Sequence, residues 1–188
     1  MFRLSRLLPL VALVALCTLS VQAQDSTLKV KEGDAFPDIK LPATQIASVL
    51  PDAKDAKELT VKSFVGKKNV VVFFYPRAMT PGCTVESCGF RDLVAKFAEL
   101  DTVVIGASND KIDAQEKFTT KESLKTPLLA DSDNKLLKAL GIENAKGSAA
   151  QRVTFVVDKE GKIVKIYPKV DAKTHPDEVL KFVKEMKK

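Results

Sequence analysis

The feature that most constrains the fold of this 188-residue chain is a continuous apolar run, Val70–Phe74, which stops shortly before a helix start. Its β-branched and aromatic residues are typical of a strand buried on both faces. Pro76 ends this strand, because proline has no N–H to donate to a strand ladder. Beyond it, apolar residues recur at helical spacing and predict a helix with one buried face, at Phe90, Leu93, Val94, Phe97 and Leu100.

Two residues mark where this helix begins. Thr80 is a favoured N-cap and Pro81 a favoured first helical residue, which places Cys83 in the first turn. There the sulfur lies beside unpaired backbone N–H groups and the positive end of the helix dipole, and both favour the nucleophilic thiolate. The Thr80 hydroxyl is close enough in sequence to bond this sulfur or a bound oxygen, while Pro76 offers an apolar wall. Taken singly, each residue has a purely structural interpretation, and together they predict a reactive pocket.

A second cysteine, Cys88, follows Cys83 with four residues between them. In an unbroken helix the Cα atoms of such a pair are roughly 8–9 Å apart, whereas a disulfide requires about 4.4–6.8 Å. A Cys83–Cys88 disulfide therefore implies that the helix start unwinds on oxidation. Gly89 would ease this, since an interior glycine costs a helix about 1 kcal/mol relative to alanine. The alternative, a permanent structural disulfide, would discard both the cap signature and the apolar periodicity.

The run from Pro76 to Cys83 resembles the P-x-x-x-T-x-x-C active-site pattern of the peroxiredoxins. Its continuation to Asp92 resembles the peroxiredoxin Q, or bacterioferritin-comigratory-protein, branch of the AhpC/TSA family. This resemblance implies a thiol-dependent peroxidase that reduces hydrogen peroxide and organic hydroperoxides. By the same resemblance Cys83 is the peroxidatic cysteine, which becomes a sulfenic acid, and Cys88 resolves it to an intramolecular disulfide. A thioredoxin-like or other dithiol reductant is implied as partner, with no metal, haem or flavin cofactor.

Arg152 immediately precedes the predicted strand Val153–Asp158, and in peroxiredoxins an arginine at this place faces the peroxidatic cysteine. The resemblance therefore assigns Arg152 to catalysis, since its guanidinium can stabilise charge as the O–O bond breaks. It also assigns Pro76 and Thr80, with Arg152, to substrate binding, and it makes Glu86 the residue that holds Arg152 in place. A plain surface charge is the usual alternative for a single arginine.

The rest of the chain alternates predicted strands and helices. Strands are expected at 102–108, 128–131, 153–158 and 162–167, and helices at 112–119, 134–141 and 176–186. With the first strand and helix, the order β-α-β-α-β-α-β-β-α is that of a thioredoxin-like α/β fold, with a central mixed sheet flanked by helices. Residues 24–188 are expected to form one such domain. Residues 30–42 resemble the N-terminal β-hairpin region of peroxiredoxins, and no function is assigned to Ala43–Glu58.

Residues 1–23 have the three regions of a secretory signal peptide: Arg3 and Arg6, an apolar stretch, and Val21-Gln22-Ala23. The apolar stretch is short for a membrane span of about 20 residues, which disfavours an uncleaved anchor. We therefore expect an exported protein, periplasmic or secreted, with no stable membrane insertion after cleavage of the signal peptide. As a separate expectation, the protein is a monomer or weak dimer. The remaining 188 − 23 = 165 residues carry a net charge of 28 − 24 = +4, because two of the 30 basic residues and none of the 24 acidic ones are removed. Scattered lysines do not indicate nucleic-acid binding.

Other functions fit the sequence less well. A thioredoxin-like thiol-disulfide oxidoreductase would have C-x-x-C, whereas this chain has C-x-x-x-x-C. A cysteine hydrolase needs a base, and the single histidine, His175, is more simply a surface or helix-start residue. Two cysteines and one histidine after cleavage cannot complete the usual zinc ligand set. A non-catalytic binding or holdase domain with a structural disulfide remains an alternative from another class.

Overall fold

The computed structural model describes residues 28–53 and 55–186, so the predicted signal peptide lies outside the described residues. Within those ranges no helix combines the length and apolar character needed to cross a membrane. In chain order the elements, with 3₁₀ helices written η, are β1 Leu41–Pro42, η1 Ile46–Ser48, β2 Glu58–Leu59, η2 Val61–Phe64, β3 Asn69–Phe74, α1 Pro81–Ala98, β4 Thr102–Ser108, α2 Ile112–Lys121, β5 Leu128–Ala130, α3 Lys135–Leu140, β6 Val153–Val157, β7 Ile163–Tyr167 and α4 His175–Met186.

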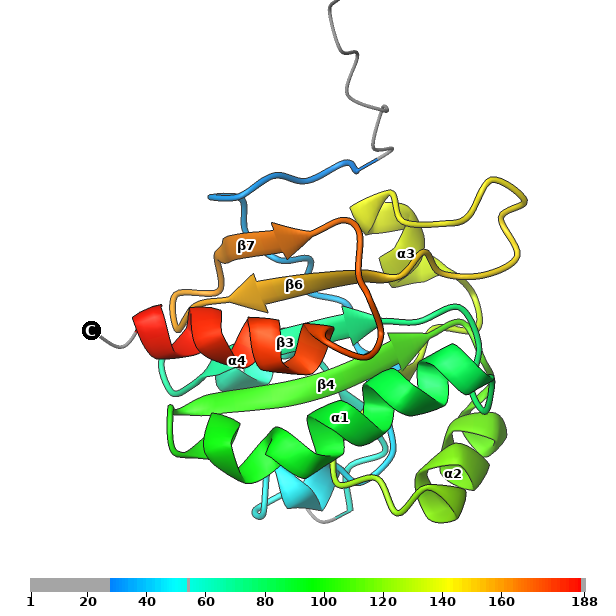
Figure 1. The fold of residues 1–188 in the computed structure, drawn as a ribbon, viewed down its shortest axis with the longest axis horizontal. Helices are drawn as coiled ribbons and strands as arrows, with labels where there is room; N and C mark the ends of the chain where they lie inside the picture. Colours follow the sequence, from blue (N-terminus) through cyan, green and yellow to red (C-terminus); the bar gives the residue numbers. More distant parts are fainter. Residues whose placement is uncertain (1–27, 54, 187–188) are drawn as a thin grey trace, which may run out of the picture.

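A five-stranded sheet in the order β5-β4-β3-β6-β7 forms the centre of the molecule (Figure 1). β3 runs parallel to β4, with Asn69 opposite Thr102 and Phe74 opposite Ala107, and β4 runs parallel to β5. β6 is antiparallel to both β3 and β7. This mixed sheet and the order of elements from β3 to α4 confirm the predicted thioredoxin-like α/β class.

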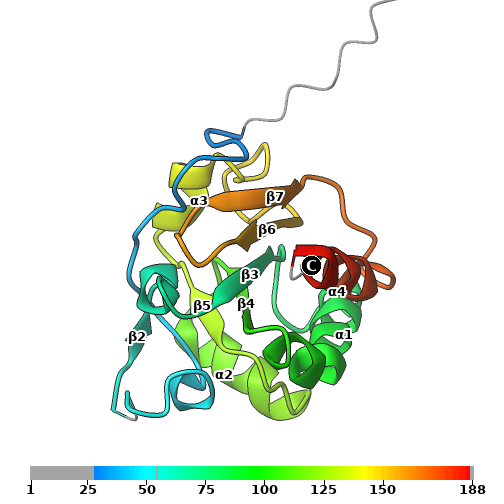
Figure 2. The ribbon, with the colours of Figure 1, turned by 90° about the vertical axis from the view of Figure 1, so that its left-hand side faces the viewer.

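β3 separates two apolar cores because its side chains alternate between the faces of the sheet. Val70, Val72 and Phe74 pack against α3 and the N-terminal segment, whereas Val71 and Phe73 pack beneath α1, α2 and α4. Figures 1 and 2 show α1 and α4 side by side on this second face. The active-site helix is thus held from below by a strand that is buried on both faces, as the sequence predicts.

The N-terminal stretch crosses from one edge of the sheet to the other. At the β7 edge, Ile163 N donates to Asp34 O and Ile166 N donates to the Glu32 carboxylate. At the β5 edge, Ala43 bridges to Leu129, and Thr44 exchanges hydrogen bonds with Leu128. The stretch therefore does not form a hairpin of its own: β1 pairs with β2, and the two strands enclose the segment 43–57.

The start of α4 packs closely on α1. A Cβ at Gly89 would lie 2.8 Å from Pro176 Cγ, so this glycine allows the two helices to approach, a role that the sequence did not indicate. His175 beside it is fully buried, with a ring nitrogen 2.8 Å from Thr154 Oγ1 and its ring edge-on to those of Phe90 and Tyr167. Its predicted position at the helix start is confirmed, but the predicted surface location is wrong, because the imidazole fills the space between α4 and the sheet.

We expect Gly89→Ala to lower the free energy of unfolding by about 1–3 kcal/mol, because the rigid Pro176 ring cannot move away from the new methyl group. Helix propensity alone predicts the opposite sign, a gain of about 1 kcal/mol. Urea unfolding of Gly89→Ala, Pro176→Ala and the double variant measures the effect. If the loss persists unchanged in the Pro176→Ala background, the contact is not its cause.

Candidate active site

The loop between β3 and α1 carries the predicted motif. Tyr75 extends the strand by one backbone hydrogen bond to Ala107 O, half-buried Pro76 follows, and Met79 adopts a left-handed φ of 62°, which is uncommon for a residue other than glycine. Thr80 is the N-cap residue and Pro81 the first helical residue, as predicted. The Thr80 side chain does not cap the helix, however, because its hydroxyl donates to Arg77 O at 3.0 Å. Toward a bound hydroperoxide this oxygen is therefore left as an acceptor.

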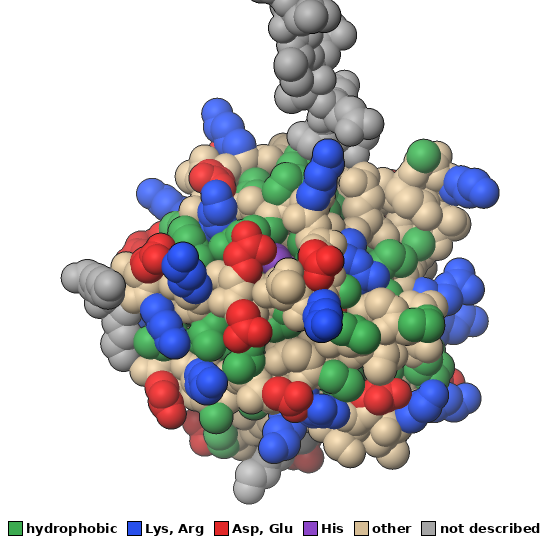
Figure 3. Space-filling view, in the orientation of Figure 1, with side chains coloured by type: hydrophobic (Ala, Val, Ile, Leu, Met, Phe, Trp, Pro, Cys, Tyr) green, Lys and Arg blue, Asp and Glu red, His purple; other side chains and the backbone are tan. Residues whose placement is uncertain are grey.

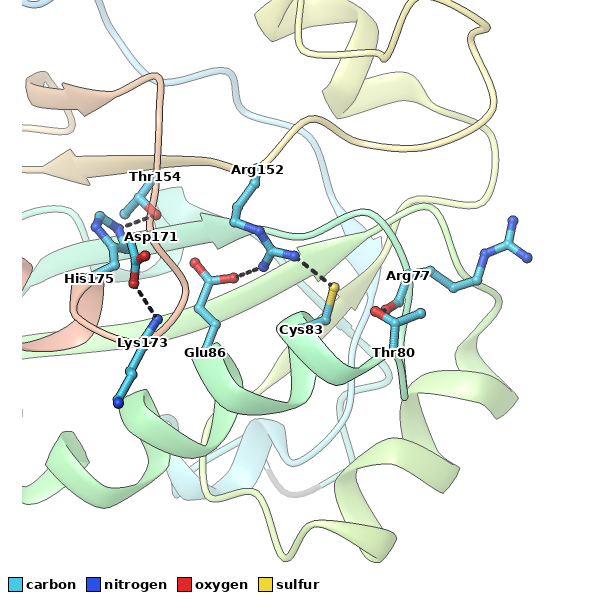
Figure 4. Close-up of polar contacts among 9 residues, drawn as sticks. All are labelled: Arg77, Thr80, Cys83, Glu86, Arg152, Thr154, Asp171, Lys173 and His175. Atoms are coloured by element: carbon cyan, nitrogen blue, oxygen red, sulfur yellow. Dashed lines mark hydrogen bonds and ion pairs between the residues drawn. The ribbon is translucent and has the colours of Figure 1, made fainter.

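Cys83 lies in the first turn of α1 and is only 1% exposed. Figure 4 shows the Arg152 guanidinium between Cys83 and Glu86: Nη2 lies 3.2 Å from Cys83 Sγ, while Nη1 pairs with Glu86 Oε2. The planar fork of arginine suits it to meet two partners at once. The structure thus brings Arg152, the residue before β6, together with two predicted site residues from the first two turns of α1 that are distant from it in sequence.

Burial disfavours the charged forms of both Glu86 and Arg152 and so acts on the pKa of each group. Glu86 is fully buried, and burial raises the pKa of its carboxyl to about 7 despite the opposing effect of Arg152. Burial also disfavours the charge of Arg152, but Glu86 and Cys83 outweigh it and the pKa of Arg152 is raised. Glu86 Oε1 has no hydrogen-bond partner among the described residues. The guanidinium is therefore the positive charge next to both the sulfur and a carboxylate that ionises reluctantly.

A hydrogen-bond network that the sequence did not indicate ties the motif loop to the residues after β4. Asp110 Oδ2 accepts from Ala78 N and from Ser108 Oγ, each at 2.7 Å. Gln115 Nε2 donates to Ser108 Oγ at 2.8 Å, and its Oε1 accepts from Tyr75 OH at 2.5 Å. Asp110 follows β4, whose carboxyl end lies at the same sheet edge as that of the parallel strand β3, and polar residues at this edge are a usual sign of a site.

Cys88 lies on the same helix, half-buried, and both cysteines are free thiols. Its Sγ is directed at Glu122 Oε2, 4.0 Å away, instead of toward Cys83. α1 is continuous from Pro81 to Ala98, so the predicted Cys83–Cys88 disulfide belongs to a different conformation from this one.

Fold and site together define a thioredoxin-fold protein with a buried cysteine–arginine centre. The model of the AhpC/TSA family matches residues 32–166, and the chain belongs to this family. Peroxiredoxin Bcp of Escherichia coli (strain K12) is 33% identical over 161 residues, which cover 82% of this chain and 96% of that protein. Peroxiredoxin Bcp of Bacillus subtilis (strain 168) is 42% identical over 125 residues, which cover 63% and 80% of the two chains.

Among solved structures, peroxiredoxin Q of Xanthomonas campestris superposes with a TM-score of 0.72 at 26% identity, over 86% of this chain and 99% of that one. These comparisons confirm the resemblance to the peroxiredoxin Q and Bcp branch, and with it the class of thiol-dependent peroxidases.

The raised pKa of Glu86 predicts a pH-dependent stability. Between its ordinary value of 4.5 and about 7, the folded state keeps a proton that the unfolded chain has released. The contribution of Glu86 to the free energy of unfolding therefore falls as pH rises through this window, by on the order of 2–3 kcal/mol. Glu86→Gln stays neutral, so its stability relative to wild type should increase from pH 4.5 to 7 and level off outside this range.

Urea unfolding at a series of pH values measures this difference. Glu116→Gln, which alters an exposed carboxyl on α2, is the control and should show a flat profile. A Glu86→Gln profile as flat as that of the control would contradict the assignment.

Proposed function

We propose that the chain reduces hydroperoxides with Cys83 as the nucleophile. The observation that carries this is the Cys83 sulfur in the first turn of α1, with Arg152 Nη2 at 3.2 Å. The positive charge and the helix N-terminus both stabilise a thiolate there. The thiolate attacks one peroxide oxygen, the S–O bond forms and the O–O bond breaks, leaving a sulfenic acid. The released oxygen takes a proton from solvent and departs as water or an alcohol.

Arg152 acts twice in this proposal. It stabilises the thiolate before the attack, and its guanidinium lies where negative charge grows on the peroxide oxygens as the O–O bond breaks. Glu86 keeps the fork oriented through Nη1. The Thr80 hydroxyl, whose own proton is donated to Arg77 O, accepts a hydrogen bond from the O–H group of the hydroperoxide, and Pro76 bounds the site.

Cys88 completes the cycle by attacking the sulfenic acid, which yields an intramolecular disulfide and water. Since α1 separates the two sulfurs while it is intact, its first turns unwind in this step. A dithiol reductant of thioredoxin-like type then restores both thiols.

Residues 1–23 are proposed to direct export, which would place the enzyme in the periplasm or outside the cell, as a monomer or weak dimer. The three-region pattern of these residues supports this. Lys, Arg, Asp and Glu side chains are interspersed over the face in Figure 3, which gives that face no basic tract for nucleic acid.

We expect Cys83→Ser to abolish peroxide consumption, since serine provides no thiolate. Cys88→Ser should consume one equivalent of peroxide and then stall unless a thiol is added. Mass spectrometry after one equivalent of hydrogen peroxide should show a loss of two hydrogens in the wild type, mapped to a Cys83–Cys88 link. Full cycling of Cys88→Ser with thioredoxin alone would count against the resolving role.

Arg152→Lys should lower kcat/KM for hydrogen peroxide by about 10²-fold, because a point charge cannot meet Cys83 and Glu86 in two directions as the fork does. Initial rates of peroxide loss measure this. Lys173→Ala removes another cation of the close-up in Figure 4 and is expected to leave the rate unchanged. Equal losses in the two variants would mean that general positive potential, and not the guanidinium contact, accelerates the reaction.

A further inference from the structure

The surroundings of Cys88 include a carboxylate that the peroxide step does not use. Glu122 follows the last residue of α2, is half-buried, and accepts a hydrogen bond from the Cys88 thiol through Oε2, with 4.0 Å between sulfur and oxygen. Because the carboxylate is only partly buried, it can exchange protons with solvent. It contacts the atom that must lose its proton when the disulfide forms.

From Cys88 onward the helix is anchored by packing against neighbouring elements, whereas before it only one side of the helix is buried, at Cys83, Glu86 and Ser87. On the C-terminal side, Gly89 packs against Pro176, and Phe90 is fully buried with its ring stacked on that of Phe73, 4.4 Å between centroids. Arg91 Nη1 donates to the backbone oxygen of Glu122 at 2.6 Å. These contacts hold the segment that carries Cys88 against α2 and α4.

The first turns of α1 have fewer restraints. Pro81 and Gly82 are exposed, and the Val85 side chain is 48% exposed. Cys83 and Glu86 are buried and each contacts Arg152, and oxidation of Cys83 to a neutral sulfenic acid removes the thiolate charge that the first of these contacts stabilises. Unwinding is therefore expected to proceed from the N-terminus of α1, so that Cys83 moves toward a Cys88 that stays beside Glu122.

Cys88 needs a base to react from this position. Burial raises the pKa of its thiol; Glu122 and Asp92 raise it further, while Arg91 lowers it. At neutral pH the group is therefore predominantly a thiol, and thiols attack sulfur slowly until the proton is removed. A carboxylate already within reach of that proton can remove it during the attack.

We propose that Glu122 is a catalytic residue of the resolving step, accepting the Cys88 proton as Cys88 Sγ attacks the sulfenic acid of Cys83. The S–S bond forms and the S–O bond of the sulfenic acid breaks. The departing hydroxide takes up one proton and leaves as water, while Glu122 releases the proton it accepted. The two electrons were already removed from sulfur by the hydroperoxide, so no further oxidant is needed; the inference thus rests on the proposed peroxidase function.

The test follows the two steps separately in the full-length protein. Reduced protein is mixed with one equivalent of hydrogen peroxide and quenched in acid at successive times, and its intact mass is measured by mass spectrometry. Gain of one oxygen reports the sulfenic acid, and loss of two hydrogens reports the disulfide. Glu122→Gln is the test variant, and it keeps the backbone oxygen that anchors Arg91. Asp92→Asn is the matched control, since it removes a nearby charge that pairs with Arg91 without contacting Cys88 Sγ.

In Glu122→Gln we expect sulfenic acid to form at the wild-type rate and the disulfide at least about tenfold more slowly at neutral pH. The disulfide rate should then rise more steeply with pH than in wild type, as hydroxide replaces the missing base. Asp92→Asn should stay within about twofold of wild type.

An unchanged disulfide rate in Glu122→Gln would overturn the proposal. A faster rate would also overturn it, and would mean that Glu122 only keeps Cys88 protonated. If the wild type forms neither sulfenic acid nor disulfide, it is the peroxidase function itself that fails, and the time courses distinguish the two cases.

Discussion

The active site depends on one half-buried cation, the Arg152 guanidinium, placed between a sulfur and a carboxylate. Removing a guanidinium from water is costly, and the cost is offset only if its partners are held in good geometry. Here the partners come from two consecutive turns of one helix, so the orientation of α1 fixes both at once. The strand β3, the network around Asp110 and the packing of α4 all act on the position and orientation of that helix.

The opposing demand on α1, in the proposed cycle, is that its first turns must also unwind so that the two sulfurs can meet. Intact, it places Cys83 beside Arg152 and keeps Cys88 turned toward Glu122. The distribution of contacts along its length reconciles the two demands, since the packing of Gly89 and Phe90 and the Arg91 hydrogen bond all lie beyond Cys88. Local opening of the first turns therefore need not disturb Phe90, and the apolar core beneath the sheet stays closed while the sulfurs react.

The parts of the structure that could be predicted from sequence are those determined by residues close together in the chain. The buried strand before Pro76, the Thr80–Pro81 helix start and the order of elements all follow from periodicity and capping, and the structure has them. The position of Arg152 opposite Cys83, 69 residues away, came only from the family resemblance. Local patterns contain no signal for contacts that exist only after folding.

The burial of His175 and the close approach at Gly89 depend on where α4 comes to lie, and a lone histidine beside a proline gives no hint of it. The Asp110 network and the contact between Glu122 and Cys88 likewise join residues of different elements. Thr44, in a segment without an assigned function, bonds the β5 edge in a way that no local pattern shows.

The course of the N-terminal stretch across the molecule has a further consequence. By bonding to β7 through Asp34 and to β5 through Thr44, it occupies some of the backbone groups at both margins of the central sheet. An open margin is a template on which strands of other copies can grow into aggregates. If the first turns of α1 open in each turnover, as the proposed cycle requires, this stretch limits the pairing of strands between copies during the opening, with residues that take no part in the chemistry.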